Sequence, residues 1–279
     1  MKVMVTGATG FIGGNLAREL WRRGDDVRAL VRPGSNRLTI ENTGIVPIEG
    51  DILDRQSVDR AVQGCEAVFH VAAAYTFWSR DPAGISRTNV AGTLNVLEAA
   101  RQAGVSRTVY TSTVGTVALV KDGLGDEDTP LDPKSLHGHY KRSKLQAERE
   151  ALALAAAGMP LVVVNPTAPV GPWDVKPTPT GKMVLDFLRR KIPAYLKTGM
   201  NVVDVADVVE GHILALEKGK SGERYILGNR NVSLKEIFDI LSSQTGLPAP
   251  RIRAPYWLVV GAGYADRFIE GTIFRREPA

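Results

Sequence analysis

A tyrosine and a lysine lie four residues apart in the segment 139–144, which reads as the start of a helix. Residues at positions i and i+4 share one face of a helix, so Tyr140 and Lys144 are expected to be neighbours. A free phenol has a pKa of about 10 and is a weak acid–base catalyst at neutral pH. An adjacent ammonium favours the phenolate and lowers that pKa. The pair therefore predicts a proton-transferring tyrosine, although the same spacing also occurs on ordinary helix surfaces.

Three hydroxyl side chains follow one another at Thr111, Ser112 and Thr113, where a predicted strand that begins at Arg107 comes to its end. An uncharged hydroxyl on a second element can hold a substrate oxygen while the tyrosine moves a proton. Thr113, or its neighbour Ser112, is placed to do this. We therefore expect a catalytic group made of Tyr140, Lys144 and one of these two hydroxyls, Thr113 or Ser112.

The element that must position a reaction partner lies at the start of the chain. Gly7, Gly10 and Gly13 separate a short apolar run from the segment 15–21, which has helical spacing of its apolar residues. A strand, a glycine turn and a helix form the context in which such a triplet indicates dinucleotide binding. Gly7 would allow a tight turn, Gly10 the approach of a pyrophosphate, and Gly13 close packing of the helix. The helix N-terminus would offer N–H groups to the phosphates.

Residues after the next two predicted strands suggest how the rest of a dinucleotide would be held. The second strand, 27–32, ends in Arg32, and a guanidinium suits the 2′-phosphate of NADP, whereas an acidic residue would suit NAD. We therefore predict NADP, with NAD remaining possible. Asp51 and Ile52 end the third strand and are placed to contact an adenine. Asp51 is equally well placed to cap the helix predicted over 54–62.

The fourth predicted strand, 66–74, ends in small residues, Ala72, Ala73 and Ala74, which would let the backbone run beside a cofactor. His70 within it is interpreted as a packed strand histidine. Tyr75, Phe77 and Trp78 follow and could form one wall of a substrate pocket. A long helix is predicted over 82–103, and Asn89 within it indicates a bond to a neighbouring turn or a small kink, because asparagine is a poor helix former.

Composition narrows the function classes. The 279 residues carry a net charge of +5 that is spread along the chain, so an anionic cofactor is expected rather than a nucleic acid. The single cysteine, Cys65, excludes an internal disulfide and a cysteine-based zinc site, and we expect no metal. No stretch approaches the length of about 18 apolar residues that a membrane span needs. A strand begins at the first residues, so we expect no secretory signal and a cytoplasmic location.

Taken together, the segments Thr6–Gly13 and Thr111–Thr113 and the pair Tyr140 and Lys144 resemble the extended short-chain dehydrogenase/reductases, the group of NAD-dependent epimerases and dehydratases. The segment 27–32 is similar to dihydroflavonol reductase-like members, in which the second arginine faces the 2′-phosphate of NADP. The segments 138–144 and 176–181 resemble bacterial proteins called hopanoid-associated sugar epimerases.

The resemblance implies an α/β fold with a Rossmann-type, doubly wound parallel sheet. It implies that Tyr140 acts as the acid/base, that Lys144 lowers its pKa and binds the nicotinamide ribose, and that Thr113 orients the substrate oxygen. The family usually has serine at this last position, and threonine keeps the hydroxyl. We expect the cofactor to contact Gly7, Thr9, Gly10, Phe11, Ile12, Gly13, Arg32, Asp51, Ile52, Ala72, Ala73, Ala74, Thr111, Tyr140, Lys144, Pro166 and Thr167.

We predict a dinucleotide-binding domain over 1–170, with a return to this core around 201–228. A substrate-binding lobe is predicted over 171–200 and 229–279, with Asp207 as a helix N-cap and a capped helix over 233–244. Since the family normally continues for several dozen residues beyond the last residue here, we expect this lobe to be truncated. Homodimers are common in the family, so a homodimer is possible.

The expected activity is an NAD(P)-dependent oxidoreductase that acts on a carbonyl or a secondary alcohol of a small molecule. One alternative is a sugar-nucleotide epimerase, which oxidises and re-reduces one carbon and retains its cofactor. Another is a regulator that senses NADP without catalysis.

Overall fold

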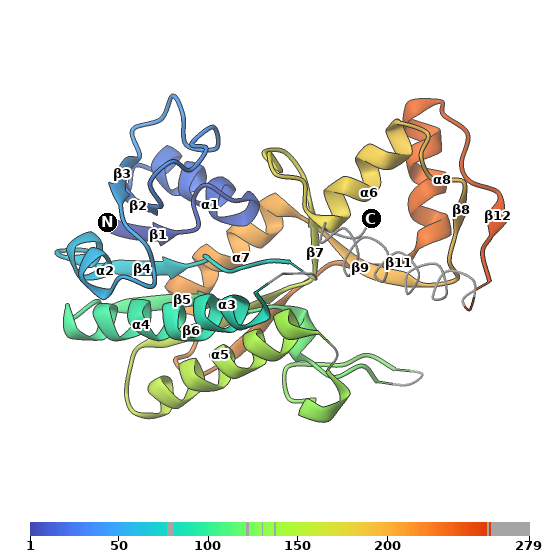
Figure 1. Ribbon diagram of the computed structural model, residues 1–279. Helices are drawn as coiled ribbons and strands as arrows, with labels where there is room; N and C mark the ends of the chain where they lie inside the picture. Colours follow the sequence, from blue (N-terminus) through green and yellow to red (C-terminus); the bar gives the residue numbers. More distant parts are fainter. Residues whose placement is uncertain (77–80, 121–122, 130, 137, 256, 258–279) are drawn as a thin grey trace.

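A seven-stranded parallel sheet forms the centre of the computed structural model, which describes residues 1–76, 81–120, 123–129, 131–136, 138–255 and 257 (Figure 1). The strand order is β10-β6-β5-β4-β1-β2-β3. This is the order of a doubly wound dinucleotide-binding sheet with one strand added, so the predicted fold class is confirmed. The strands are β1 (Lys2–Thr6), β2 (Asp26–Val31), β3 (Val46–Glu49), β4 (Ala67–His70), β5 (Arg107–Thr111), β6 (Leu161–Pro166) and β10 (Arg224–Leu227).

Helices cover both faces of this sheet, which explains why the strands β4 and β6 are buried along their whole length. On one face, α1 (Phe11–Arg22) and α7 (Val205–Lys218) pack on side chains such as Val3 and Val5. On the other face, α2 (Arg55–Val62), α4 (Gly92–Gln102) and α5 (His139–Ala156) pack on side chains such as Met4. The alternation of Val3, Met4 and Val5 between two cores follows from the two-residue period of a strand.

The helix predicted over 82–103 has an interruption at Asn89. It is divided into α3 (Pro82–Ser86), a π-helical turn (Arg87–Ala91) and α4, and Asn89 lies buried in that turn. π-Turns inside helices are rare and are frequent at functional sites. The predicted bond to a neighbouring turn is confirmed, because the Asn89 side chain accepts a hydrogen bond from the backbone N–H of Ala74 at 2.7 Å.

The remaining elements lie beyond the carboxyl end of β6 (Figure 1). A three-stranded sheet joins β7 (Ala168–Val170), β9 (Gly199–Asp204) and β11 (Arg230–Ser233). The helices are α6 (Pro179–Leu188) and α8 (Leu234–Thr245), and a second small sheet pairs β8 (Ala194–Tyr195) with β12 (Ile252–Arg253). Short 3-10 turns occur at Val114–Thr116 and Pro133–Ser135. Part of the lobe predicted over 229–279 lies outside the described residues.

Two predicted helix caps can be compared with the structure. Ser233 caps α8 through a reciprocal pair of hydrogen bonds with Glu236, as the capped helix predicted there requires. The assignment of Asp207 was wrong. Asp204 caps α7 by accepting from the N–H of Ala206, and Asp207 lies inside the first turn. An aspartate in either position is favourable, since both lie near the positive end of the helix.

Within the described part of the chain, none of the helices combines the length and the apolar character needed to cross a membrane. In the same residues, histidine, cysteine and carboxylate side chains do not gather in groups of three or more that would bind a metal.

Candidate active site

The structure brings Tyr140 and Thr113 together. Tyr140 lies in the first turn of α5 with only 8% of its surface exposed, and Thr113 follows the end of β5. The Thr113 hydroxyl lies near the Tyr140 phenol and acts to lower the pKa of that phenol. The ring of Tyr75 packs edge-on against the Tyr140 ring, with 4.9 Å between centroids. Tyr75 is half exposed, so an aromatic wall stands between the Tyr140 phenol and solvent. Phe77 and Trp78, predicted for the same wall, lie outside the described residues.

Lys144 lies one turn further along α5 and is 2% exposed. Its ammonium donates hydrogen bonds to the phenol oxygen of Tyr110 and to the backbone carbonyl of Thr111, each at 2.8 Å. The contact between Tyr110 and Lys144 was not predicted from the sequence. A tyrosine inside a fully buried strand is a signal that could have found it, because a buried phenol needs a hydrogen-bonding partner.

Burial is the main influence on the pKa of Tyr140. It raises that pKa above the ordinary value of a tyrosine, the neighbouring phenol of Tyr75 acts in the same direction, and the nearby Thr113 hydroxyl acts against both. The ammonium of Lys144 donates to Tyr110 and Thr111, so its predicted lowering of the Tyr140 pKa stays a prediction. Burial lowers the pKa of Lys144 to about 7, with the Glu148 carboxylate opposing that shift.

A buried polar cluster holds Thr113 in place. The carbonyl of Thr113 accepts a hydrogen bond from the Asn165 amide at 3.1 Å. Glu148, one turn after Lys144, accepts from Asn165 at 2.7 Å and from Thr116 at 2.8 Å, and forms an ion pair with Arg224 at 2.9 Å. The cluster ties α5, β6 and β10 to the end of β5, so the Thr113 hydroxyl is held on rigid elements.

Asn89 helps to hold the first turn of α5, in which Tyr140 lies, against the turn after β4. Its amide donates to the Ser143 hydroxyl at 2.9 Å, and that hydroxyl donates to the Tyr140 carbonyl at 2.8 Å. The same side chain binds the backbone of Ala74. The turn after β4 is thereby fixed against the first turn of α5, which places the predicted cofactor contacts at Ala72–Ala74 beside the tyrosine.

The glycine loop has the shape that a dinucleotide needs. Gly7 has φ +76°, and a Cβ there would lie 2.8 Å from the backbone nitrogen of Ala72. A Cβ at Gly13 would lie 2.3 Å from the carbonyl oxygen of Gly7, so α1 starts against the loop itself. Gly10 is the N-cap residue of α1, and because glycine has no side chain it cannot bond to the N–H groups of the first turn. The first N–H groups of α1 are thus without a side-chain cap, which fits a pyrophosphate.

The residues predicted to contact the adenosine end are placed less closely. Arg32 is exposed, and it forms no ion pair within the described residues. Asp51 does not cap α2, so that alternative is wrong. Its carboxylate accepts from the N–H of Leu53, while Asp54 caps the helix. The role of Arg32 and the contact of Asp51 and Ile52 with an adenine remain predictions.

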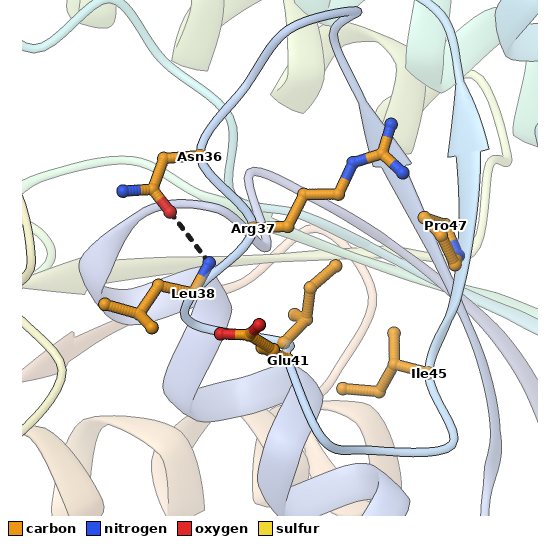
Figure 2. A pocket seen from close by; sticks show the side chains of 7 residues that line it. Asn36, Arg37, Leu38, Glu41, Ile45 and Pro47 are labelled. Atoms are coloured by element: carbon orange, nitrogen blue, oxygen red, sulfur yellow. Dashed lines mark hydrogen bonds between the residues drawn. The ribbon is translucent and has the colours of Figure 1, made fainter.

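A hollow of about 450 Å³ lies in the connection between β2 and β3, and Figure 2 shows its side chains. It does not include any residue predicted for the site. The amide oxygen of Asn36 accepts from the backbone N–H of Leu38, and Arg37 forms an ion pair with Glu49. Its lining residues are Asn36, Arg37, Leu38, Ile40, Glu41, Ile45 and Pro47.

The remaining predicted residues lie at the ends of β4 and β6. His70 is fully buried in β4 between the hydroxyls of Thr6 and Thr93, and burial lowers its pKa to about 3, so its interpretation as a packed histidine is confirmed. Pro166 ends β6, and the N–H of Thr167 donates to the carbonyl of Leu227 on β10 at 3.0 Å. Their predicted contact with a nicotinamide is not tested by these bonds.

The fold, the glycine loop and the Tyr140–Thr113 pair define a class of protein, and sequence comparison gives the same class. Residues 3–228 match the NAD dependent epimerase/dehydratase family, and the chain belongs to it. It is thus an NAD(P)-dependent oxidoreductase of the epimerase/dehydratase group.

Three relatives are named as reductases or as a demethylase component. A protein of Synechocystis sp. with the provisional name dihydroflavonol 4-reductase is 48% identical, over 91% of this chain and 75% of the relative. Sterol demethylase protein B of Methylococcus capsulatus is 35% identical over 100% of this chain and 85% of its own. Cinnamoyl-CoA reductase 1 of Petunia hybrida is 33% identical over 86% and 76%.

Two solved structures have the same fold. The crystal structure of gox2253 has a TM-score of 0.89 at 42% identity, covering 99% of this chain and 84% of that one. The dTDP-glucose 4,6-dehydratase DesIV of Streptomyces venezuelae, solved with NAD bound, has a TM-score of 0.77 at 26% identity, covering 89% and 82%.

Proposed function

We propose that this protein is an NADPH-dependent reductase of a ketone or aldehyde, with Tyr140 as the proton donor. The observation that carries this proposal is that the Tyr140 phenol, which is buried, lies close to the Thr113 hydroxyl. Two neutral hydroxyls that meet in a buried site can both donate to one carbonyl oxygen. A substrate oxygen bound there would accept from both, and the Tyr140 proton would pass to it as the carbonyl carbon is reduced.

The cofactor is held in this proposal by the uncapped start of α1, the glycine loop and the backbone at Ala72–Ala74. A bound nicotinamide supplies the hydride. Lys144 is placed to donate to the nicotinamide ribose, and Thr113 orients the substrate oxygen. Tyr75 excludes water from the phenol, which makes proton loss to solvent slower and favours delivery to the substrate.

The choice of NADPH rests on Arg32, which is exposed at the end of β2 and does not pair with a carboxylate among the described residues. A guanidinium binds a phosphate through paired charged hydrogen bonds. Arg32→Ala should weaken NADPH binding by about tenfold to a hundredfold, since a charged hydrogen bond contributes roughly 1.5–3 kcal/mol. NADH binding should not change. Arg60→Ala, an exposed arginine on α2, is the matched control. Equal loss for both cofactors would contradict the assignment.

The substrate proposed here is a small molecule with an aromatic or otherwise apolar part beside its carbonyl group. Tyr75 supports this, because its half-exposed ring forms the visible wall next to Tyr140. The names of the Synechocystis and Petunia relatives point to reductase chemistry on phenolic compounds. Oxidation of NADPH should be measured with a panel of aryl ketones, dihydroflavonols and cinnamoyl thioesters. A panel that never consumes NADPH would count against a reductase and favour an NADP-sensing protein.

A sugar-nucleotide epimerase is the second candidate, and the similarity to a dTDP-glucose 4,6-dehydratase favours it. Such an enzyme oxidises and re-reduces its substrate and consumes no cofactor overall. Purified protein that carries a tightly bound, non-exchanging nicotinamide and converts a sugar nucleotide without net NADPH oxidation would support this candidate over the reductase.

A further inference from the structure

A chain of buried hydrogen bonds leads away from Lys144 on the side opposite the substrate. The Lys144 ammonium donates to the phenol of Tyr110 at 2.8 Å, and the Thr93 hydroxyl lies near that phenol. Thr93 in turn lies 2.9 Å from Nε2 of His70, whose Nδ1 lies 2.8 Å from the Thr6 hydroxyl. The chain joins α5, β5, α4, β4 and β1. Its side chains at positions 6, 70, 93 and 144 are at most 2% exposed.

The hydrogens of this chain can be assigned from its far end. The Thr6 hydroxyl oxygen accepts from the backbone N–H groups of Val71 and Ala72, each at 3.1 Å. Both acceptor positions of that oxygen are then occupied, so the Thr6 hydrogen must be donated to Nδ1 of His70. A neutral imidazole carries one hydrogen, and the lowered pKa of His70 keeps it neutral. The His70 hydrogen therefore lies on Nε2.

The assignment continues through Thr93. Its hydroxyl oxygen accepts from Nε2 of His70, and its single hydrogen is donated to the Asn89 carbonyl at 2.7 Å. Thr93 has no hydrogen left to donate, so it can face the nearby Tyr110 phenol only as an acceptor of the phenolic hydrogen. Tyr110 consequently presents a lone pair, and no hydrogen, to Lys144.

Lys144 depends on this lone pair, because the carboxylate nearest to it is occupied. The groups that act on the ammonium are Tyr110 and the Thr111 carbonyl from β5, His70 from β4, and Glu148 from α5. Glu148 is bonded to Arg224, Thr116 and Asn165, and no carboxylate among the described residues forms an ion pair with Lys144. The acceptors of the ammonium are the Tyr110 phenol and the Thr111 carbonyl.

We propose that Tyr110 is a positioning residue that holds Lys144 in place and keeps its ammonium charged, through a phenol whose hydrogen is directed away to Thr93. This inference rests on the proposed function for its catalytic meaning, since Lys144 is there the group that binds the nicotinamide ribose. Two of the three ammonium hydrogens are committed to Tyr110 and Thr111, so one donor remains for the cofactor.

The test measures the titration of Lys144 without cofactor or substrate. The free energy of unfolding in urea is measured against pH for Tyr110→Phe and for the double variant Tyr110→Phe/Lys144→Met. The difference between the two reports the pH at which Lys144 loses its proton in the folded protein. A hydrogen bond to a charged group changes a protonation equilibrium by about a factor of ten. The pH at which folded Lys144 loses its proton should therefore be about one unit lower in Tyr110→Phe than in the wild type, where it is obtained in the same way from the wild type and Lys144→Met.

Tyr225→Phe, measured with and without Lys144→Met, is the matched control. It removes a phenol that accepts from the backbone of Lys220, far along the sheet on β10. It should leave the midpoint unchanged. A Tyr110→Phe midpoint equal to that of the wild type would overturn the proposal.

Nitrogen-15 NMR of histidine-labelled wild-type protein tests the hydrogen assignment and needs no variant that could fail to fold. His70 should carry its hydrogen on Nε2. His212 should show the opposite tautomer, because its Nδ1 donates to the Val208 carbonyl at 2.7 Å. A His70 hydrogen on Nδ1 would refute the hydrogen assignment at Thr6 and Thr93, whereas the Tyr110→Phe midpoint decides the proposal itself. Neither measurement uses turnover, so loss of the proposed reductase activity would leave this result unaffected.

Discussion

Burial of Lys144 makes the stability of the protein depend on pH in a defined direction. Its pKa is about 7 in the folded protein and 10.5 when it is unperturbed. Between these values the unfolded chain binds a proton that the folded protein does not, so the free energy of unfolding rises with pH. Integrated from pH 7 to pH 9, the contribution of this one lysine is about 2 kcal/mol. Below pH 7 the folded protein must bury a charged ammonium, and stability is lowest there.

Lys144→Met removes this titration and keeps most of the side-chain volume. Urea unfolding of both proteins should be measured at intervals from pH 6.5 to pH 9. Between pH 7 and pH 9, the free energy of unfolding of the wild type should rise by about 2 kcal/mol more than that of the variant. The lost bonds to Tyr110 and Thr111 add an offset that does not depend on pH, and groups such as Cys65 titrate in both proteins and cancel. Parallel curves for the two proteins would refute the assigned pKa and the burial argument behind it.

Three further changes test the remaining parts of the site. Gly13→Ala places a Cβ 2.3 Å from the Gly7 carbonyl oxygen, so it should lower the free energy of unfolding by at least about 2 kcal/mol and abolish NADPH binding. Gly115→Ala, where the nearest atom to the new Cβ is 3.5 Å away, should lower the free energy of unfolding by less than about 1 kcal/mol. Thermal or urea unfolding measures both. Glu148→Gln leaves the Arg224 guanidinium without its buried partner and should destabilise by about 3 kcal/mol, and equal stability in urea would show that the buried ion pair does not hold the cluster. Arg32→Ala should weaken NADPH binding and spare NADH binding in fluorescence titrations, as set out above.

The sequence was sufficient to predict the layers of the fold and the meeting of Tyr140 with Thr113. A run of apolar residues such as 161–164 is typical of a strand in a parallel sheet that helices cover on both faces. Their carboxyl ends share one edge of the sheet, so a hydroxyl at the end of β5 and a tyrosine that opens the next long helix were expected to meet there. The spacing of the glycines predicted the position of the loop. Only glycine fits at position 13, against the Gly7 carbonyl, and at position 7, against the backbone of Ala72.

The partner of Lys144 and the pKa of Tyr140 were beyond the reach of sequence reasoning. The contact between Lys144 and Tyr110 joins residues that lie 34 positions apart, and it depends on how α5 packs on β5. The pKa of Tyr140 depends on how much of the phenol is buried, which spacing along a helix does not report. The helix caps are Asp54 and Asp204, whereas the sequence suggested Asp51, three residues before the first, and Asp207, three residues after the second. Where two aspartates lie this close together, the sequence does not show which of them caps the helix.

Transfer of deuterium from C4-deuterated NADPH to the carbonyl carbon of a reduced substrate, compared between wild type and Tyr140→Phe, tests the proposed reaction most directly. Wild-type protein should place one deuterium on the new carbinol carbon. Tyr140→Phe should bind NADPH as tightly and slow the transfer by about a hundredfold or more, since it lacks the proton donor. Unlabelled product from the wild type, or undiminished transfer by the variant, would contradict a hydride-transferring site built on Tyr140.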